Sequence, residues 1–121
     1  MSALRRAAEQ PYSVEFTEAP GIFVKSMHVK ERFTYIPQHA HTTAHLTMVA
    51  KGEVLLWKDG AFAGRYTAPA GIHIEARVKH LFMTWVDDCL LYCIHRVDGE
   101  EGPEIAAEHQ LLEAIGGEAA A

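Results

Sequence analysis

The sequence predicts an all-β domain of antiparallel strands, arranged as a sandwich or barrel, with one short helix at its C-terminal end. β-Branched and aromatic residues occur in short runs from Tyr12 onward, turn residues separate these runs about every ten residues, and no helical period lies between them. The chain has 121 residues, of which 49% are hydrophobic and 22% charged. This length suits one packed core and is too short for two ordinary domains.

The expected strands follow one another through most of the chain. After the turn at 19–21, the runs of strand-forming residues are Ile22 to Val29, Phe33 to His41, His45 to Ala50, Glu53 to Trp57, Ala61 to Tyr66, Ile72 to Ile74, His80 to Val86 and Cys89 to Arg96. The turns between the later runs are Lys51-Gly52, Lys58-Asp59-Gly60, Pro69-Ala70-Gly71 and Asp87-Asp88. Parallel strands need long crossovers, so these short connections favour antiparallel pairing.

The two ends of the chain differ from the strand region at 12–100, which we expect to be the barrel domain. Residues 1–11 form an N-terminal arm in this prediction, because Pro11 stops any helix there. A helix is expected over 101–116, with Pro103 in its first turn and Gly116 at its end. Its apolar stripe is Ile105, Leu111, Leu112 and Ile115. Residues 117–121 are expected to be a loose tail.

Charge and cysteine content restrict the partners and the location. Eleven Lys and Arg against sixteen Asp and Glu give a net charge of -5, which argues against nucleic acid or an anionic membrane as the main partner. No apolar run approaches a membrane span, and the first six residues lack the apolar stretch of a secretory signal, so we expect a cytoplasmic protein. Cys89 and Cys93 lie four residues apart on one expected strand, roughly 13 Å by strand rise, and should be reduced core thiols.

Histidines form the most informative cluster. The chain has eight, and His39, His41 and His45 fall within seven residues. On a strand, His39 and His41 project to the same side, His45 opens the next strand, and His80 opens another one 35 residues later. A closed sheet could bring that strand back beside the first pair. Converging neutral imidazoles suit zinc, copper, nickel, iron and, more weakly, manganese, so the cluster predicts a transition-metal site.

The spacing of these histidines resembles a known motif. The first motif of the cupin superfamily reads His-x-His, three or four residues, Glu, six residues, Gly. This sequence contains a similar arrangement, namely His39-Ala40-His41, three residues, His45, six residues and Gly52. His45 stands where most members have Glu. The resemblance is therefore to the tetra-histidine cupins, in which four imidazoles hold the metal.

The second cupin motif, usually Gly, five residues, Pro-x-Gly-x-x-His, is less well matched. The segment 71–80 resembles a shortened version, with Glu75 at the Pro position, Arg77 at the Gly position and His80 as the ligand. An alternative alignment begins on a literal Pro-x-Gly two residues earlier and makes His73 the ligand. We prefer His80, because the long apolar strands that follow it resemble the closing cupin strands.

The resemblance covers roughly Ile22 to Arg96 and implies a single cupin-type β-barrel, an RmlC-like jelly roll. It implies one divalent transition metal per chain, Fe, Mn, Ni, Cu or Zn, held by His39, His41, His45 and His80. Four neutral ligands leave the ion its full +2 charge, which favours an anionic, chelating guest. A zinc ion coordinated tetrahedrally by the four imidazoles would have no open coordination position for a substrate.

Two classes of function follow from this resemblance. The first is a metal-dependent enzyme of the dioxygenase or isomerase type, acting on a small, oxygen-rich, anionic molecule. The alternative is a non-catalytic module that binds a metal or a small ligand, as a sensor or accessory protein. Tyr35 and His73 are the candidate proton-transfer groups, although each is equally explained as a packing or surface residue.

Other residues are expected to have structural roles. His28, His95 and His109 are interpreted as histidines without a catalytic part. Trp57, Phe82, Met83 and Trp85 are interpreted mainly as core residues. At Arg77, either the turn is of a different type or the guanidinium faces an anionic ligand. The run Ile22 to Val29 is expected to be an edge strand with only partial protection by Lys25 and Lys30, which favours a homodimer.

Overall fold

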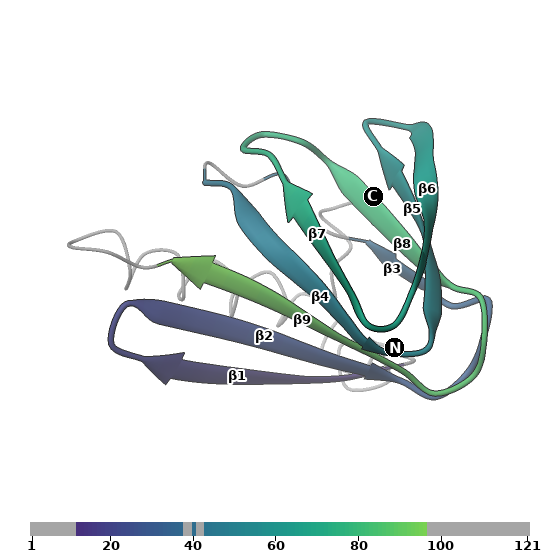
Figure 1. Cartoon of the computed structure of the whole chain (residues 1–121), viewed down its shortest axis with the longest axis horizontal. Coiled ribbons are helices and arrows are strands. Elements are labelled where there is room, and N and C mark those ends of the chain that lie inside the picture. Colours follow the sequence, from purple (N-terminus) through teal and green to yellow (C-terminus); the bar gives the residue numbers. More distant parts are fainter. Residues whose placement is uncertain (1–11, 38–39, 41–42, 97–121) are drawn as a thin grey trace, which may run out of the picture.

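The computed structural model describes residues 12–37, 40 and 43–96, and within them it is an all-β molecule of two antiparallel sheets (Figure 1). The strands are β1 (Ser13–Ala19), β2 (Ile22–Val29), β3 (Tyr35–Pro37), β4 (His45–Lys51), β5 (Glu53–Lys58), β6 (Ala61–Thr67), β7 (Ala70–Ile74), β8 (His80–Thr84) and β9 (Cys89–Arg96). The predicted antiparallel architecture is confirmed. The expected N-terminal arm, C-terminal helix and tail lie outside the described residues.

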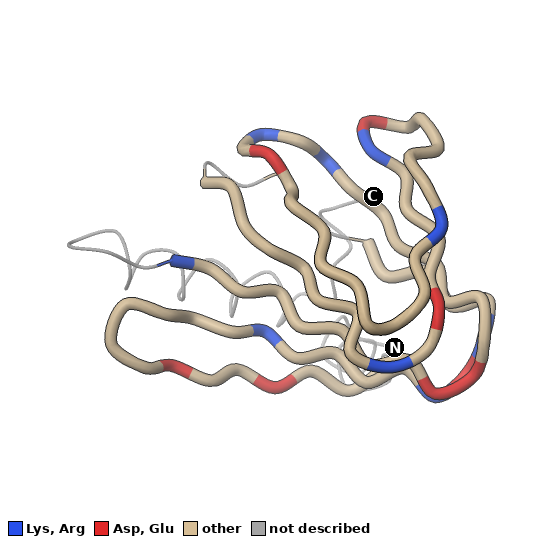
Figure 2. The backbone as a smooth tube through the Cα atoms, in the orientation of Figure 1, with Lys and Arg blue, Asp and Glu red and all other residues tan. Residues whose placement is uncertain are grey.

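The strands are divided between two layers that face each other. A five-stranded sheet has the order β1-β2-β9-β4-β7, and a four-stranded sheet has the order β3-β8-β5-β6. β4 and β8 are far apart in the sequence and belong to different sheets, but their first residues lie at the same end of the barrel, where the site described below is found. Charged residues in Figure 2 gather mostly at turns, and the central parts of β4, β7, β8 and β9 carry none.

The core fills the space between the two layers. β2 and β9 alternate strictly between buried and half-buried residues, as expected for strands with one face toward a core. The buried hydrophobic side chains are Phe23, Met27, Val29, Ile36, Val49, Val54, Leu56, Ile72, Ile74, Phe82, Cys89, Leu91 and Cys93. Both cysteines are free thiols inside this core, as predicted.

The turn at Gly52 ties the two sheets together. Gly52 has φ 91°, and a Cβ atom built on it would lie 2.5 Å from Sγ of Cys89. The backbone conformation and the close approach of β9 therefore both require glycine at this position. Asp59, Gly60 and Asp88 also have positive φ, in agreement with the turns expected there.

The strand expected to form a sheet edge lies in the interior of its sheet. β2 pairs with β1 on one side and with β9 on the other, so the prediction of an exposed edge at 22–29 was wrong. Lys25 does not protect an edge but is buried, with 1% of its surface exposed. It has the same parity as Phe23 and Met27 and shares their inward face.

The run expected from Phe33 to His41 is interrupted at its start. Phe33 has φ 61°, which breaks the strand, and β3 begins only at Tyr35. On the four-stranded sheet, Phe82 is a core residue as expected, but Trp57 and Met83 alternate with buried neighbours and lie on the outer face. The described part of the chain contains no helix that could span a membrane.

Candidate metal centre

His45 is the first residue of β4 and points into the barrel. It is 6% exposed and lies opposite Ile74 of β7. Alternation along β4 buries His45, Thr47 and Val49 together, so the inward direction of the imidazole follows from the strand period. The predicted placement of His45 at the start of a strand is confirmed.

His80 is the first residue of β8, in the other sheet, and is 2% exposed. Its ring centroid lies 5.1 Å from that of His45. Nδ1 of His80 lies 3.4 Å from the backbone oxygen of Val78. A carbonyl oxygen can only accept, so Nδ1 is the donor in this contact, and the lone pair of the neutral ring is on Nε2. A metal-binding histidine is usually oriented by a hydrogen bond from its second ring nitrogen to a backbone carbonyl or a carboxylate.

The turn before His80 supports the alignment of the second motif. Arg77 has φ 62°, the left-handed conformation for which glycine is preferred, and it occupies the position where the motif has Gly. The conformation at Arg77 is thus one that glycine would adopt readily. The side chain of Arg77 is exposed.

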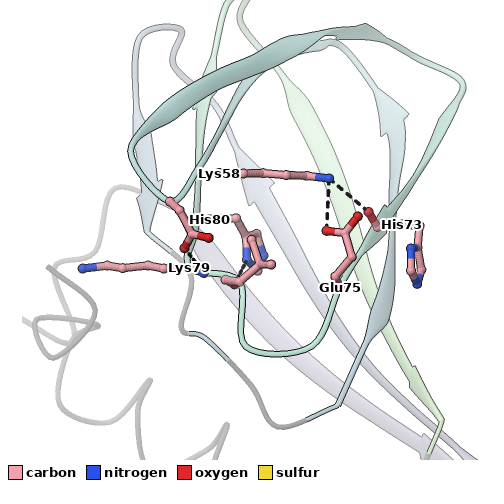
Figure 3. A network of polar contacts seen from close by, with 7 residues as sticks. Lys58, His73, Glu75, Lys79 and His80 are labelled. Atoms are coloured by element: carbon pink, nitrogen blue, oxygen red, sulfur yellow. Dashed lines mark hydrogen bonds and ion pairs between the residues drawn. The ribbon is translucent and has the colours of Figure 1, made fainter.

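Glu75, at the usual Pro position of that turn, is an exposed charge. Figure 3 shows its carboxylate beside Lys58, whose Nζ lies 3.4 Å from Oε2 of Glu75 and 3.5 Å from the backbone oxygen of His73. A hydrogen bond from its own backbone amide, followed by the Lys58 ammonium, lowers the pKa of Glu75. These contacts connect the end of β5 to the end of β7 beside the histidines. The lowered pKa keeps Glu75 ionised.

The two buried imidazoles fit a shared metal ion. Nitrogen ligands about 2.1 Å from an ion, at angles between tetrahedral and octahedral, put ring centroids about 4.5 to 5.3 Å apart. The 5.1 Å separation of His45 and His80 falls in this range. The other expected ligands, His39 and His41, lie outside the described residues. Within the described ranges, no group of three His, Cys, Asp or Glu side chains is placed to hold a metal.

His95 belongs to this cluster, although the sequence interpretation gave it no role. It is 1% exposed, and its ring stacks on that of His45, with centroids 4.5 Å apart and planes at 26°. A ligand approaches a metal through a nitrogen at the ring edge, whereas stacking on the ring face fixes orientation. Because the ring planes are close to parallel, we assign His95 an orienting contact with His45, an assignment that the variant His95→Gln tests. Its parity with Cys89 and Cys93 on β9 was the signal that it faces inward.

The two candidate proton-transfer residues do not point into the barrel interior. Tyr35 is 57% exposed, whereas its neighbour Ile36 is fully buried. His73 is exposed on β7 between the buried residues Ile72 and Ile74, and in Figure 3 its ring lies well away from that of His80. Of the two interpretations left open for Tyr35, its exposure agrees with the surface residue.

A cavity of about 270 Å³ opens at the end of the five-stranded sheet, next to the histidine cluster. Its lining includes His45 and His95 together with His73 and Arg96. The remaining lining residues are Gly21, Ile22, Ala44, Leu46 and Ile94. Leu46, His73 and Ile94 are paired across neighbouring strands and alternate with the buried residues, so the cavity is an open one on the outward side of the sheet, with His45 and His95 at its inner edge.

Comparison with solved structures places this architecture among known proteins, whereas two sequence comparisons find no match. The sequence matches no family model and no curated protein. Solved structures with a similar fold include a cupin 2 conserved barrel domain protein from Salinispora arenicola (TM-score 0.63, 13% identity, 83% of this chain and 87% of that chain). An RmlC-like cupin with a double-stranded β-helix fold from Methanocaldococcus jannaschii has TM-score 0.60 and 18% identity over 72% of this chain and 81% of that chain.

A third similar structure is the DMSP lyase DddQ from Ruegeria pomeroyi, with TM-score 0.62 and 14% identity. The match covers 74% of this chain but only 49% of the lyase chain. These likenesses establish the fold: the described strands form a cupin-type barrel, as the motif resemblance implied.

Proposed function

We propose that this protein is a metal-binding cupin whose metal is held by His39, His41, His45 and His80. The observation that carries the proposal is the 5.1 Å approach of the buried His45 and His80 rings from two different sheets. In the sequence, His39 and His41 stand six and four residues before His45, the first residue of β4. All four donors are imidazoles, which suits a divalent ion of Fe, Mn, Ni, Cu or Zn.

We propose further that the protein is an enzyme of the dioxygenase or isomerase type that acts on a small, oxygen-rich anion. A divalent ion with four neutral ligands would supply Lewis acidity at its open positions. The residues of the chain that would receive the anion line the cavity beside His45. Arg96 and His73 provide N–H donors there, and Ile22, Leu46 and Ile94 provide an apolar wall.

A non-catalytic binding module is the second candidate, and one observation favours it. Among the described lining residues of the cavity there is no carboxylate, phenol or thiol, the candidate proton-transfer residue His73 is exposed on the outward side of β7, and Tyr35 also points outward. A site of this kind would bind a chelating anion and release it unchanged. Both candidate functions involve the same metal and the same kind of anion. The enzyme would convert the anion to a product, whereas the binding module would not.

The test is ligand binding at the metal, followed by turnover. The untagged full chain is loaded with Co²⁺, and its visible absorption is recorded while oxalate is added as a chelating probe. We expect a spectral change, and we expect Arg96→Gln to weaken oxalate binding several-fold while Lys30→Gln, at an exposed position outside the cavity, leaves it unchanged. A cobalt spectrum that does not respond to oxalate would contradict an open metal site.

Oxygen uptake and product analysis with a panel of hydroxy and keto acids then separate the two candidates. Turnover that requires the metal supports the enzyme. Oxalate binding without turnover of any of these acids supports the binding module.

A further inference from the structure

The inner face of β2 carries a positively charged side chain that is buried. Lys25 is 1% exposed and projects to the same side of β2 as Phe23 and Met27. Removing an ammonium group from water is costly unless a carboxylate or other acceptors surround it. The burial of Lys25 therefore calls for a covering surface that is apolar and also brings negative charge.

The first half of β2 lies beside the main hydrophobic core, not within it. Met27 and Val29 belong to the contiguous cluster of buried core residues, whereas Phe23 does not, although it is fully buried. The Phe23 ring stacks on that of Phe16 in β1, with centroids 5.5 Å apart. In Figure 1 the turn that joins β1 to β2 projects beyond the strands of the four-stranded sheet. A further segment is therefore needed to cover Phe23 and Lys25.

The charge of the chain beyond β9 complements this face. Residues 97–121 contain seven of the sixteen Asp and Glu residues and none of the eleven Lys and Arg residues, so residues 1–96 carry a net charge of +2. Of the other residues outside the described ranges, 1–11 contain two arginines and one glutamate, and 38–39 and 41–42 contain no acid. Opposite charge thus favours 97–121 as the segment that meets Lys25.

One carboxylate of this segment stands among its apolar residues. In the helix expected over 101–116, side chains three and four positions apart are neighbours. Glu108 stands three positions after Ile105. It also stands three and four positions before Leu111 and Leu112. An apolar helix face with a carboxylate at its centre matches a sheet face with buried aromatic rings and a buried ammonium.

We propose that the segment 97–121 folds back over the inner face of β1 and β2, and that Glu108 pairs with Lys25 there. β9 ends at Arg96, directly opposite Ile22 at the start of β2. Lys25 lies three residues farther along β2, about 10 Å from that end. Glu108 lies seven residues into the expected helix, about 10 Å from its start. A helix that runs back beside β2 therefore brings the two charges level.

The docked segment adjoins the histidine cluster without depending on it. The Phe23 ring lies 6.1 Å from that of His95, so a segment that covers Phe23 also shields this side of the cluster from water. The pairing of Glu108 with Lys25 needs no metal ion, and the proposal stands apart from the proposed metal site.

The first experiment is nuclear Overhauser spectroscopy of the full chain with isotope-labelled methyl groups. We expect contacts between the rings of Phe16 and Phe23 and the methyl groups of the apolar stripe, namely Ile105, Leu111, Leu112 and Ile115. A sample that mixes labelled and unlabelled copies separates contacts within one chain from contacts between two copies.

The second experiment is urea unfolding of variants at the proposed pair. We expect Glu108→Gln to lower the midpoint by at least about 1 M, because it leaves the Lys25 ammonium buried opposite a neutral group. The matched control is Glu113→Gln, whose neighbours three and four positions away are polar residues or glycines, and its midpoint should equal that of wild type. Lys25→Met combined with Glu108→Leu replaces both charges by apolar groups and should recover most of the loss.

Methyl contacts to Phe16 and Phe23 that arise only between copies would overturn the proposal, because a second chain would then cover this face. Contacts from residues 1–11 in place of the stripe would also overturn it. If Glu108→Gln unfolds at the wild-type midpoint, or loses no more than Glu113→Gln, Glu108 does not pair with Lys25.

Discussion

The imidazole rings of His45 and His80 lie with their centroids 5.1 Å apart, although the two residues belong to different sheets. Each begins its strand at the same end of the barrel, and each is buried by the alternation of that strand. Packing of the two sheets therefore sets the separation of the rings on which the proposed metal site depends. Removing one ring should accordingly affect metal binding much more than folding.

His80→Gln and His95→Gln form a matched pair that tests which buried histidine is a ligand. Both replace a buried imidazole by an amide of similar size. We expect His80→Gln to lower metal affinity at least tenfold, and His95→Gln to retain stoichiometric metal with a smaller loss, because His95 stacks on His45 in our assignment. Isothermal titration with Ni²⁺ measures both affinities. Equal losses would show that His95 is itself a ligand.

His45→Glu restores the residue that most cupins carry at this position. A carboxylate is a harder ligand than imidazole and adds one negative charge, so we expect the variant to keep its metal and to shift its preference from Cu²⁺ and Ni²⁺ toward Mn²⁺ and Fe²⁺. Competition between Mn²⁺ and Ni²⁺, measured by elemental analysis after dialysis, gives the ratio. A variant that holds no metal would show that His45 does not occupy the ligand position of the first motif.

Much of this fold could be predicted because its strands are short and its turns carry Gly and Asp. The eight runs of strand residues agree closely with β2 to β9, except where Phe33 takes a left-handed conformation and delays β3. Strand order could not be predicted, since it depends on pairings between distant segments. For this reason β2 was placed at an edge when it lies between β1 and β9.

The site was only partly predictable for the same reason. His45 and His80 stood out through spacing, whereas the parity of His95 showed only that it faces inward, and its place beside His45 required the pairing of β9 with β4. Strand period did show that Lys25 shares the parity of Phe23, but a lysine is rarely buried, so its charge suggested an exposed edge. On the four-stranded sheet, hydrophobicity alone did not separate Phe82 of the core from Trp57 of the outer face.

Gly52→Ala should destabilise the protein strongly, and Gly60→Ala provides the control. Both glycines have positive φ, 91° and 82°, which costs an alanine about 1–2 kcal/mol. Only at Gly52 does the added Cβ also meet Cys89, at 2.5 Å from Sγ and 3.0 Å from Cα. Overpacking of this kind costs a further 1–3 kcal/mol, roughly. Urea unfolding measures both free energies, and equal losses would contradict the close approach of β9 to Gly52.

Glu53 should contribute to the acid sensitivity of folding. Hydrogen bonds from Arg65 and then Thr67 lower its pKa below the usual 4.5. A carboxyl group whose pKa is lowered in the folded state stabilises the protein above its unfolded pKa, and that contribution is lost as the pH falls through the folded pKa. Thermal melts of Glu53→Gln should therefore lose less stability than wild type below pH 4.5.

The size of this pH effect is limited by solvent. The Arg65 side chain is 57% exposed, so salt should weaken the pair and reduce the difference between Glu53→Gln and wild type. Parallel pH profiles for the two proteins at low salt would contradict the assigned role of Glu53.

The central claim is that the barrel holds one transition metal through a four-histidine set. Elemental analysis of the full chain, purified without a histidine tag and compared with His45→Ala, tests it most directly. We predict close to one iron, manganese, nickel, copper or zinc atom per wild-type chain and at least a tenfold lower content in the folded variant. A wild-type chain without metal, which also fails to bind these ions when they are added, would contradict the account.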